Sequence, residues 1–328
     1  MLNKLKSITL IALAILFAAS CRNDHGENQI SIQYDWILNM NFCGEILAEK
    51  YFDDKYGISI VHNIGGIGID PIKMVLSGVS DVGIASLEKV LMANEKGADL
   101  VVFAVANHIA PTVFLTLGSD TLNSPSDFEG KSIGLAPGSS TEFIYRALIK
   151  IGNLDAKKIE EIPADFDIKG FIEGIYEIRP AYIYVEPIDL ELNNITFNLF
   201  EPRNWGIKYP GRVYFVKRDF IEQNEELLKK FTYALAEGWK KTKSDNDLAI
   251  QELLKENPSL DTEREILSLQ LGGFYLYGYS GQVLTVDSRI LSDFGEDMIK
   301  IGLIDDKSDI ETAIDLTFVN DYHEQQKD

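Results

Sequence analysis

Residues 33–52 read QYDWILNMNFCGEILAEKYF, a strand-like opening followed by an amphipathic, helix-like run. Asp35, Trp36, Asn39 and Asn41 stand at the join between the two. A strand that only had to stop could do so with a glycine or an asparagine. The reason for an aromatic ring among polar groups at this corner must therefore lie in what the rest of the chain builds around it.

Strand-like and helix-like segments alternate along the chain after this corner. β-rich segments such as GISIVHN, DVGIAS and DLVVFAVA are separated by apolar-periodic ones such as CGEILAEKYFDDKY and LEKVLMANEKG. This alternation predicts parallel β/α units. A second set begins at KSIGLAPG, and the chain from residue 221 onward is mostly helix-like.

We therefore predict an α/β protein of two doubly wound lobes with a ligand cleft between them. The chain is expected to cross between the lobes near residues 113–118 and again near 212–218. The predicted boundaries are 1–20 for a signal peptide, 21–28 for a linker, 29–117 and 213–328 for the first lobe, and 118–212 for the second lobe.

Polar residues fall where the predicted strands end. Asp35, Trp36 and Asn39 follow the first strand, Ser86 follows the third, and His108 follows the fourth. In an open parallel sheet, ligands bind at the carboxyl ends of the strands. These residues are therefore predicted to converge on the cleft.

The segment LAPGSSTEF places Gly138, Ser139, Ser140 and Thr141 at the start of a helix. Backbone N–H groups and hydroxyls at a helix N-terminus can hold an anion or a polar ligand group. The same residue types are also ordinary N-caps, so both interpretations stay open.

The segment AYIYVEP carries Tyr182, Tyr184 and Glu186 at alternate positions, which places all three on one face of a strand. Two aromatic rings beside a carboxylate suit a flat ligand with hydrogen-bond donors. In the alternative interpretation, the tyrosines belong to the core and Glu186 faces water.

The N-terminus has the features of an export signal. Lys4 and Lys6 precede an uncharged apolar run that is too short to span a bilayer, and small residues follow it. The sequence FAASC resembles the lipobox at which bacterial lipoproteins are cleaved and acylated, so we predict lipid attachment at Cys21. The alternative is an ordinary signal that happens to be followed by a cysteine. If Cys21 carries lipid, Cys43 has no disulfide partner and is expected to be a small buried residue.

The net charge is −20, from 31 Lys and Arg residues and 51 Asp and Glu residues. This excess of acid argues against nucleic acid and against broad contact with anionic membranes, because both require basic patches. The 4 histidines stand far apart without metal-ligand spacing, and neither a phosphate-binding loop nor a Gly-x-Ser-x-Gly elbow occurs. We therefore predict no cofactor, no metal site and no enzymatic activity.

Between about residues 30 and 325, five motifs occur in a recognisable order: YDWILNMN, GGIGIDPIKMVLSGVSDVGIAS, APT, DFEGKSIGLAPGSSTE and VEPIDLEL. Their order and spacing resemble the NMT1/Thi5-like branch of periplasmic solute-binding proteins. The resemblance implies the periplasmic-binding-protein type II fold. It also implies a receptor of an ABC importer for thiamine pyrimidine precursors or a relative such as riboflavin. Leu38, Phe42, Val185, Lys208 and Pro210 depart from the family pattern, which leaves open whether the ligand is a pyrimidine, a flavin or another ring.

The resemblance also implies roles for single residues. Trp36 matches the aromatic residue that stacks on the ligand ring, Tyr182 a second aromatic wall, and Glu186 the carboxylate that binds ring or amino nitrogens. The full predicted ligand-binding set is Asp35, Trp36, Asn39, Asn41, Phe42, Ser86, His108, Gly138, Ser139, Ser140, Thr141, Tyr182, Tyr184, Glu186 and Tyr209.

We expect an exported monomer, held by lipid on a bacterial cell membrane, that delivers its ligand to ABC permease and ATPase subunits. Three alternatives remain. The first is a receptor for an alkanesulfonate or taurine-like anion, and its binding site would require an arginine directed at residues 139–141. The second is an enzyme that uses the same cleft, and the third is a surface lipoprotein, without a transport role, whose cleft is filled.

Overall fold

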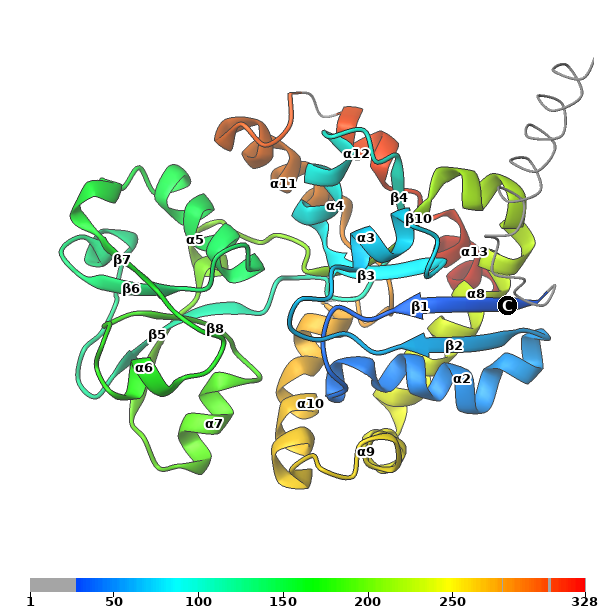
Figure 1. Cartoon of the computed structure of the whole chain (residues 1–328), viewed down its shortest axis with the longest axis horizontal. Helices are drawn as coiled ribbons and strands as arrows, with labels where there is room; N and C mark the ends of the chain where they lie inside the picture. Colours follow the sequence, from blue (N-terminus) through cyan, green and yellow to red (C-terminus); the bar gives the residue numbers. More distant parts are fainter. Residues whose placement is uncertain (1–27, 279, 306–307, 328) are drawn as a thin grey trace, which may run out of the picture.

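The computed structural model describes residues 28–278, 280–305 and 308–327 of the 328-residue chain. These residues form two lobes that lie side by side (Figure 1). The predicted signal peptide and Cys21 lie outside the described residues. Within the described ranges, no helix combines the length and the apolar character that a bilayer crossing needs.

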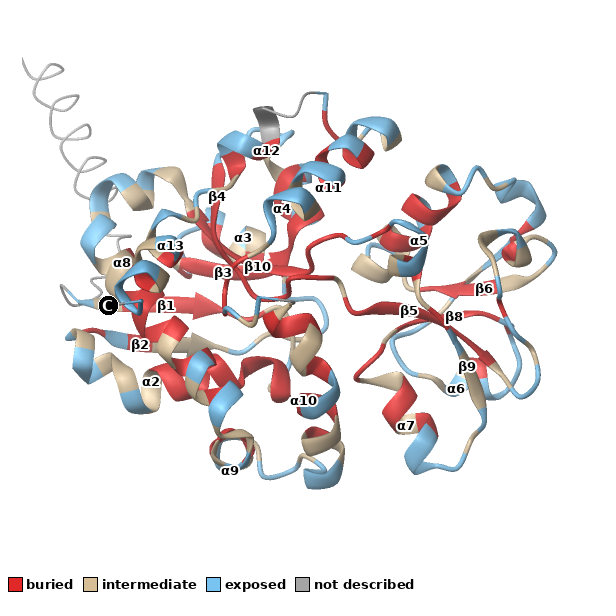
Figure 2. Cartoon of the chain, turned by 180° about the vertical axis from the view of Figure 1, so that it is seen from behind, coloured by how far each residue is buried: buried red, intermediate tan, exposed pale blue. Residues whose placement is uncertain are grey.

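Lobe 1 is built on a five-stranded sheet. Strand β1 runs parallel to β2 and β3, whereas β10 is antiparallel to β3 and β4. All six residues of β4 are buried, as expected for a strand covered by helices on both faces. Figure 2 shows the same burial along the middle of the sheet. In spatial order, the strands are β2 (Ser59–Asn63), β1 (Gln29–Gln33), β3 (Val82–Ser86), β10 (Arg212–Lys217) and β4 (Leu100–Val105).

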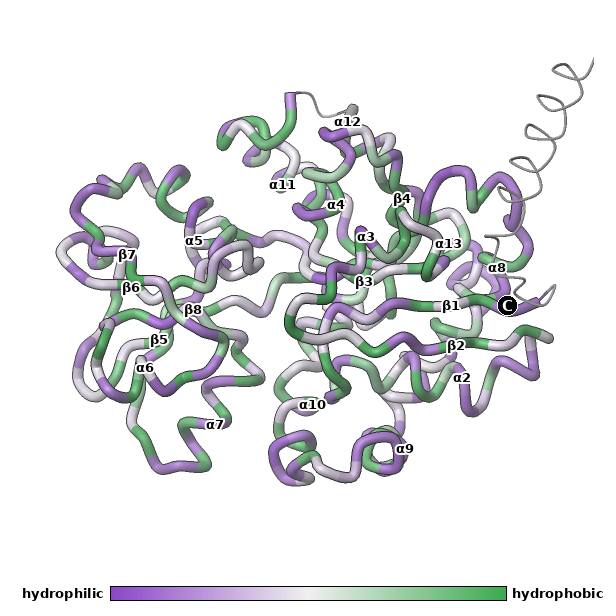
Figure 3. The backbone as a smooth tube through the Cα atoms, in the orientation of Figure 1, coloured by the Kyte–Doolittle hydropathy of each residue, from purple (hydrophilic) through white to green (hydrophobic). Residues whose placement is uncertain are grey.

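Helices cover both faces of this sheet (Figure 1). Helices α2 and α8 approach closely because they meet through glycines: a Cβ on Gly238 would lie 2.1 Å from the carbonyl oxygen of Gly44. The first six residues of α2 are all buried, whereas its C-terminal half is more exposed and mixes hydrophobic and hydrophilic residues (Figure 3). One face carries α2 (Cys43–Tyr56), α8 (Arg218–Ser244), α9 (Asn246–Glu256), α10 (Thr262–Tyr277) and α13 (Thr317–Gln325); the other carries α3 (Pro71–Leu76), α4 (Leu87–Asn94), α11 (Ser288–Ile301) and α12 (Ser308–Ala313).

Lobe 2 repeats the strand order of lobe 1. A bridge between Ile133 and Ile178 joins its two small sheets, so that the combined order is β7-β6-β8-β5-β9. Strand β5 is antiparallel to both of its neighbours, as β10 is in lobe 1. The elements are β5 (Thr112–Leu117), β6 (Ser132–Leu135), β7 (Glu160–Pro163), β8 (Arg179–Tyr182), β9 (Phe197–Phe200), α5 (Ser140–Ile151), α6 (Lys169–Ile172), α7 (Glu186–Leu192), η3 (Pro125–Phe128), η4 (Ala156–Lys158) and η5 (Pro202–Trp205).

Two short segments connect the lobes. Residues 106–111 follow β4, residues 207–211 precede β10, and backbone hydrogen bonds hold them side by side. The N–H of Gly211 donates to the carbonyl oxygen of Asn107 at 2.9 Å. A Cβ on Gly211 would lie 2.8 Å from the Cβ of Asn107, so this close approach requires a glycine.

The position of β5 corrects the predicted boundary between the lobes. Its pairing with β8 and β9 places residues 112–117 in lobe 2, although the sequence analysis assigned them to lobe 1. The apolar run TVFLTL does not reveal which sheet it will join, because both sheets bury strands of this kind. The crossings therefore lie at residues 106–111 and 207–211, not at 113–118 and 212–218.

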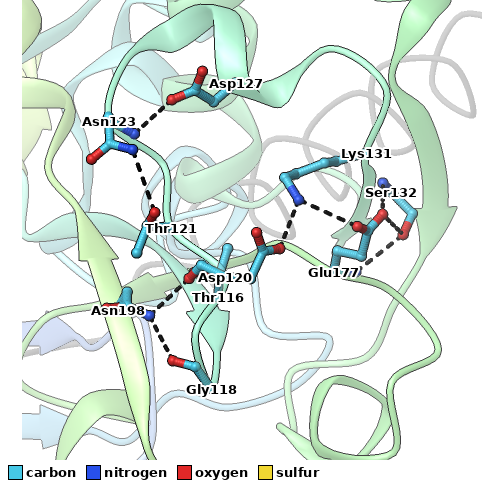
Figure 4. Close-up of polar contacts among 10 residues, drawn as sticks. All are labelled: Thr116, Gly118, Asp120, Thr121, Asn123, Asp127, Lys131, Ser132, Glu177 and Asn198. Carbon is cyan, nitrogen blue, oxygen red and sulfur yellow. Dashed lines mark hydrogen bonds and ion pairs between the residues drawn. The ribbon is translucent and has the colours of Figure 1, made fainter.

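Side-chain polar contacts hold the long connection between β5 and β6 (Figure 4). The Nζ of Lys131 lies 2.7 Å from a carboxylate oxygen of Asp120 and 3.4 Å from one of Glu177. Asn198 on β9 donates from its Nδ2 to the carbonyl oxygen of Asp120 at 2.7 Å. Because these residues flank β5, β6 and β8, the contacts fix the outer end of lobe 2.

Candidate ligand-binding site

A cleft of about 1400 Å³ lies between the lobes. Lobe 1 contributes the corner at residues 35–42, the loop at 66–73 and the start of α4, and lobe 2 contributes the start of α5 and the end of β8. Asp35 after β1, Ala136 after β6, and the last residues of β3 and β8 all line it. The carboxyl ends of strands from both sheets therefore face one cleft, as the sequence predicted.

Most of the predicted ligand-binding residues line this cleft, and His108 and Tyr209 do not. The lining residues from the predicted set are Asp35, Trp36, Asn39, Asn41, Phe42, Ser86, Gly138, Ser139, Ser140, Thr141, Tyr182, Tyr184 and Glu186.

His108 packs against the end of α10 instead of the cleft. A Cβ on Gly278 would lie 2.4 Å from the Nδ1 of His108, and the backbone N–H of His108 donates to the carbonyl oxygen of Tyr275 at 2.8 Å. The residue is only 4% exposed, and burial lowers the pKa of its imidazole to about 4. The prediction was wrong because the chain turns into the crossing segment directly after β4, which aims the ring away from the cleft.

Tyr209 lies in the second crossing segment and packs against lobe 1. Its hydroxyl donates to Asp297 on α11 at 3.1 Å, and its ring meets Phe294 edge-on at 5.0 Å between centroids. It lines a smaller cavity beside the cleft. The geometry thus gives Tyr209 a role in holding α11 against the crossing.

The corner after β1 is shaped by its own polar groups. Asn39 caps the 3-10 helix η2 (Met40–Phe42), with its Oδ1 accepting the N–H of Asn41 at 2.9 Å. The carboxylate of Asp35 accepts from the Nε and Nη2 of Arg212, both at 3.0 Å. Asn41 is 9% exposed, and its Oδ1 has no hydrogen-bond partner within the described part of the chain. Asp35 and Asn39 therefore shape the corner, whereas Asn41 keeps an acceptor that a ligand can use.

Arg212, the first residue of β10, is a cleft residue that the sequence analysis missed. Its Nη1 donates to the carbonyl oxygen of Asn41 at 3.1 Å, and its guanidinium lies 4.6 Å from the ring centroid of Phe42. The antiparallel register pairs Arg212 with Ser86 at the end of β3. A charged residue ahead of an apolar run is typical of an exposed strand end, so the sequence pattern carries no signal for this burial.

Aromatic rings from both lobes border the cleft. Trp36 faces Phe166 of lobe 2, with ring centroids 5.2 Å apart and planes tilted by 55°. Phe166 is 51% exposed and lies in the loop before α6, and the sequence analysis did not assign it to the cleft. Tyr182, the predicted second wall, also lines the cleft, and its hydroxyl lies 2.6 Å from the Oγ of Ser140.

The structure places three predicted residues on the cleft, but not on one strand as predicted: Tyr182, Tyr184 and Glu186. Strand β8 ends at Tyr182, a turn follows, and α7 begins at Glu186, so strand alternation does not relate the three residues. The Oε2 of Glu186 accepts the N–H of Tyr182 at 2.9 Å, and its Oε1 lies 3.7 Å from the Nη2 of Arg179. Burial raises the pKa of the Glu186 carboxyl. The predicted location is right, whereas the strand geometry behind it was wrong.

Glu142 occupies the N-terminus of α5. Its backbone N–H donates to the Oγ of Ser139 at 3.1 Å, and its Oε2 accepts the N–H of Gly138 at 2.7 Å. Arg146, one turn further on, donates to the Oε1 of Glu142 at 3.0 Å. A carboxylate of the protein thus stands where a helix N-terminus would hold a ligand anion. Of the two interpretations that the sequence left open, the contacts support capping.

Glu88 is a further cleft residue that the sequence analysis missed. It lies in the first turn of α4, is 5% exposed, and accepts a hydrogen bond from the hydroxyl of Ser86. Burial raises the pKa of its carboxyl. It lines both the cleft and the smaller cavity beside it.

Cys43 is fully buried at the start of α2, which confirms the prediction of a small buried residue. Its Sγ lies 3.7 Å from the carbonyl oxygen of Ala249, and it does not line the cleft. In the described ranges, no three His, Cys, Asp or Glu side chains gather closely enough to hold a metal ion.

Solved structures share the two-lobed fold described above. The aliphatic sulphonate binding protein SsuA of Escherichia coli matches with a TM-score of 0.69 at 17% identity, over 88% of this chain and 92% of that one. A putative sulfonate-binding SsuA from Methylobacillus flagellatus KT matches with a TM-score of 0.71 at 14% identity, over 92% and 95%. The desulfurization enzyme DSZB matches with a TM-score of 0.62 at 11% identity, over 90% and 99%. The chain has the periplasmic-binding-protein fold, as predicted.

A family model described as NMT1/THI5 like matches residues 39–249. The chain belongs to this NMT1/THI5-like family. A comparison with curated protein sequences finds no match. Because the structural relatives named above are at most 17% identical to the chain, they establish its fold and not its ligand.

Proposed function

We propose that this protein is the substrate-binding component of an ABC importer. Its cleft captures a small planar heterocycle, such as a thiamine pyrimidine precursor or a related vitamin like riboflavin. Family membership and the two-lobed fold support the receptor role. In this proposal, closure of the lobes over the ligand precedes delivery to the permease.

The observation that carries the ligand class is the aromatic boundary of the cleft. Trp36 of lobe 1 faces Phe166 of lobe 2, and the acceptor atoms of Asn41 and Glu186 lie on the same cleft. A flat ring with hydrogen-bond donors on its edge can stack on the aromatic surface and donate to these oxygens. An aliphatic ligand could donate to the oxygens but could not stack on the aromatic rings.

An alkanesulfonate is the alternative ligand, because the Escherichia coli relative is an aliphatic sulphonate binding protein. Such an anion needs unpaired positive charge or free N–H groups. The carboxylate of Glu142 already caps the start of α5, and the guanidinium of Arg212 is already paired with Asp35. Carboxylates of the protein hold both places, so neither offers the unpaired positive charge or free N–H groups that an anion needs.

Two further alternatives are enzymatic activity and a surface role without transport. The enzyme DSZB shares the fold. In this chain the thiol of Cys43, which would be a candidate nucleophile, lies in the core and not on the cleft. A surface lipoprotein that lost its ligand would be expected to have a filled cleft, whereas this cleft measures about 1400 Å³. Recovery of the bound ligand without chemical change would separate a receptor from an enzyme.

The proposal includes the location and the partners of the protein. Export by the N-terminal signal and lipid attachment at Cys21 would tether a monomer to the cell membrane. The permease and ATPase subunits of the importer are the expected protein partners, and the ligand is the expected small-molecule partner.

A thermal melting series tests the ligand class. The series contains thiamine, its formylamino and hydroxymethyl pyrimidine precursors, riboflavin, taurine and nitrate. A ligand that binds only the native state at a thousandfold excess over its Kd stabilises that state by roughly 4 kcal/mol, which shifts the melting temperature by several degrees. A shift with a ring compound supports the proposal. A shift with taurine or nitrate alone that persists in Trp36→Ala would overturn the heterocycle and leave the receptor fold standing.

A further inference from the structure

Glu88 differs from the other acidic residues of the cleft in its charge environment. Each of the others forms an ion pair with a lysine or an arginine, whereas Glu88 forms none among the described residues. Its hydrogen-bond partner is the neutral hydroxyl of Ser86. The five paired acids are Asp35 with Arg212, Asp70 with Lys73, Glu142 with Arg146, Glu186 with Arg179, and Glu265 with Arg264.

A small side chamber of about 20 Å³ adjoins Glu88 and the cleft. Thr112 lines this chamber, is 6% exposed, and has an Oγ1 without a hydrogen-bond partner within the described residues. Ser140 and Tyr182 close the chamber from lobe 2. A space of this size accommodates one group as large as a water molecule. Its lining is mostly apolar, and Glu88 and Thr112 contribute polar atoms that such a group can bind.

We propose that Glu88 and this side chamber form the subsite for a protonated amino group of the ligand. The ligand class becomes a planar ring with an ammonium-bearing substituent, so the inference rests on the proposed function of the cleft. The ring would lie against the aromatic boundary, and the ammonium would enter between Glu88 and the hydroxyl of Thr112.

An ammonium fits this subsite for electrostatic reasons. A buried carboxylate without an ion-pair partner is costly, and a charge-assisted hydrogen bond from an ammonium compensates it. Arg212 also lines the chamber, but its charge is neutralised by the two hydrogen bonds to Asp35. An ammonium has three donors, and Glu88 and Thr112 both offer acceptor atoms to it.

Two matched pairs of compounds test the subsite by calorimetric titration. The first pair has one pyrimidine ring with either an aminomethyl or a hydroxymethyl substituent. The second pair is benzylamine and benzyl alcohol, which carry the same substituents on a ring without nitrogen. The proteins are the wild type, Glu88→Gln, Glu88→Asp and, as a control, Glu45→Gln. Glu45 is also buried, but it accepts from the hydroxyl of Tyr214 and lies outside the cleft lining.

In each pair, the wild type should bind the amine at least about tenfold more tightly than the alcohol, as expected for one hydrogen bond to a charged group. Glu88→Gln should bring the two compounds within about threefold of each other, whereas Glu88→Asp keeps part of the preference and Glu45→Gln keeps all of it. If Glu88→Gln does not fold, the test rests on two results: the preference of the wild type for the amine, and the reduced preference of Glu88→Asp.

The outcomes separate this inference from the proposed function. Equal binding of the two pyrimidines, or tighter binding of the alcohol, overturns the ammonium subsite and leaves the heterocycle receptor standing. A preference for benzylamine that depends on Glu88, without binding of either pyrimidine, supports the subsite and overturns the pyrimidine. Failure of both amines to bind overturns the subsite.

Discussion

The guanidinium of Arg212 and the carboxylate of Asp35 form a two-pronged hydrogen-bonded pair in the lining of the cleft, with both N–O distances at 3.0 Å. The pair ties the corner after β1 to the first residue of β10. The side chain of Arg212 is 8% exposed and that of Asp35 is 26% exposed, so most of the pair is removed from water. It fixes the corner that carries Trp36 and neutralises the charge that an anionic ligand would seek.

Replacing Arg212 by Met should destabilise the protein by about 3 kcal/mol, because the carboxylates of Asp35 and Glu45 lose their nearby cation. Urea unfolding at neutral pH measures the change. Arg289→Met is the matched control, because Arg289 is 87% exposed in its pair with Asp287 and its loss should change the free energy of unfolding much less. Equal costs for the two variants would contradict a structural role for the buried pair.

Trp36→Ala should weaken ligand binding by about tenfold, since stacking contributes on the order of 1 kcal/mol and buried area is lost as well. Tryptophan fluorescence should change on ligand binding in the wild type, because Trp36 loses water contact. The change should disappear in Trp36→Phe and persist in Trp205→Phe, whose parent residue stacks on Phe200 outside the cleft lining. If the fluorescence change instead disappeared in Trp205→Phe, the ligand ring would bind away from Trp36.

Glu186→Gln should reduce the affinity for ligands with ring or amino N–H donors by about tenfold, because a neutral amide accepts less strongly than a carboxylate. Ligands without such a donor should bind nearly as well as to the wild type. Titration of both kinds of ligand against both proteins measures the difference. A uniform loss for all ligands would indicate instead that the turn between β8 and α7 has been disturbed.

His108 should make folding sensitive to mildly acidic pH. Its pKa is lowered by burial from 6.5 to about 4, so the unfolded chain binds a proton before the folded one. The stability from neutral His108 is present above pH 6.5 and is lost as the pH falls toward 4, by about 3 kcal/mol in full. Urea unfolding of wild type and His108→Gln between pH 7 and pH 4 should show a smaller decline in the variant. Parallel declines would refute this assignment.

Cys21→Ser should release the protein from the membrane fraction and abolish labelling with a lipid precursor, as expected if Cys21 is acylated. Cys43→Ser is the control, because Cys43 is buried in the core and should not affect fractionation. Membrane association that persists in Cys21→Ser would count against lipid attachment at this residue.

The sequence predicted the α/β architecture and most of the cleft, because apolar periodicity and strand-end polarity are local signals. It could not predict the partners of β5, since an apolar strand of six residues fits either sheet. Phe166 and Arg212 were missed for a related reason: an aromatic in a polar loop and an arginine at the start of a strand are typical of a surface. Only the tertiary arrangement of the lobes brings these two side chains to the cleft.

The return of the chain from lobe 2 to lobe 1 at β10 has a consequence for the order of folding. All five strands of lobe 2 come from one continuous stretch, residues 112–200, whereas the sheet of lobe 1 needs β10 between β3 and β4. As the chain grows from its N-terminus, β4 therefore has no neighbouring strand until residue 217 has been made. The sheet of lobe 1 therefore cannot be completed until the whole of lobe 2 has been synthesised, whereas lobe 2 can complete its own sheet first.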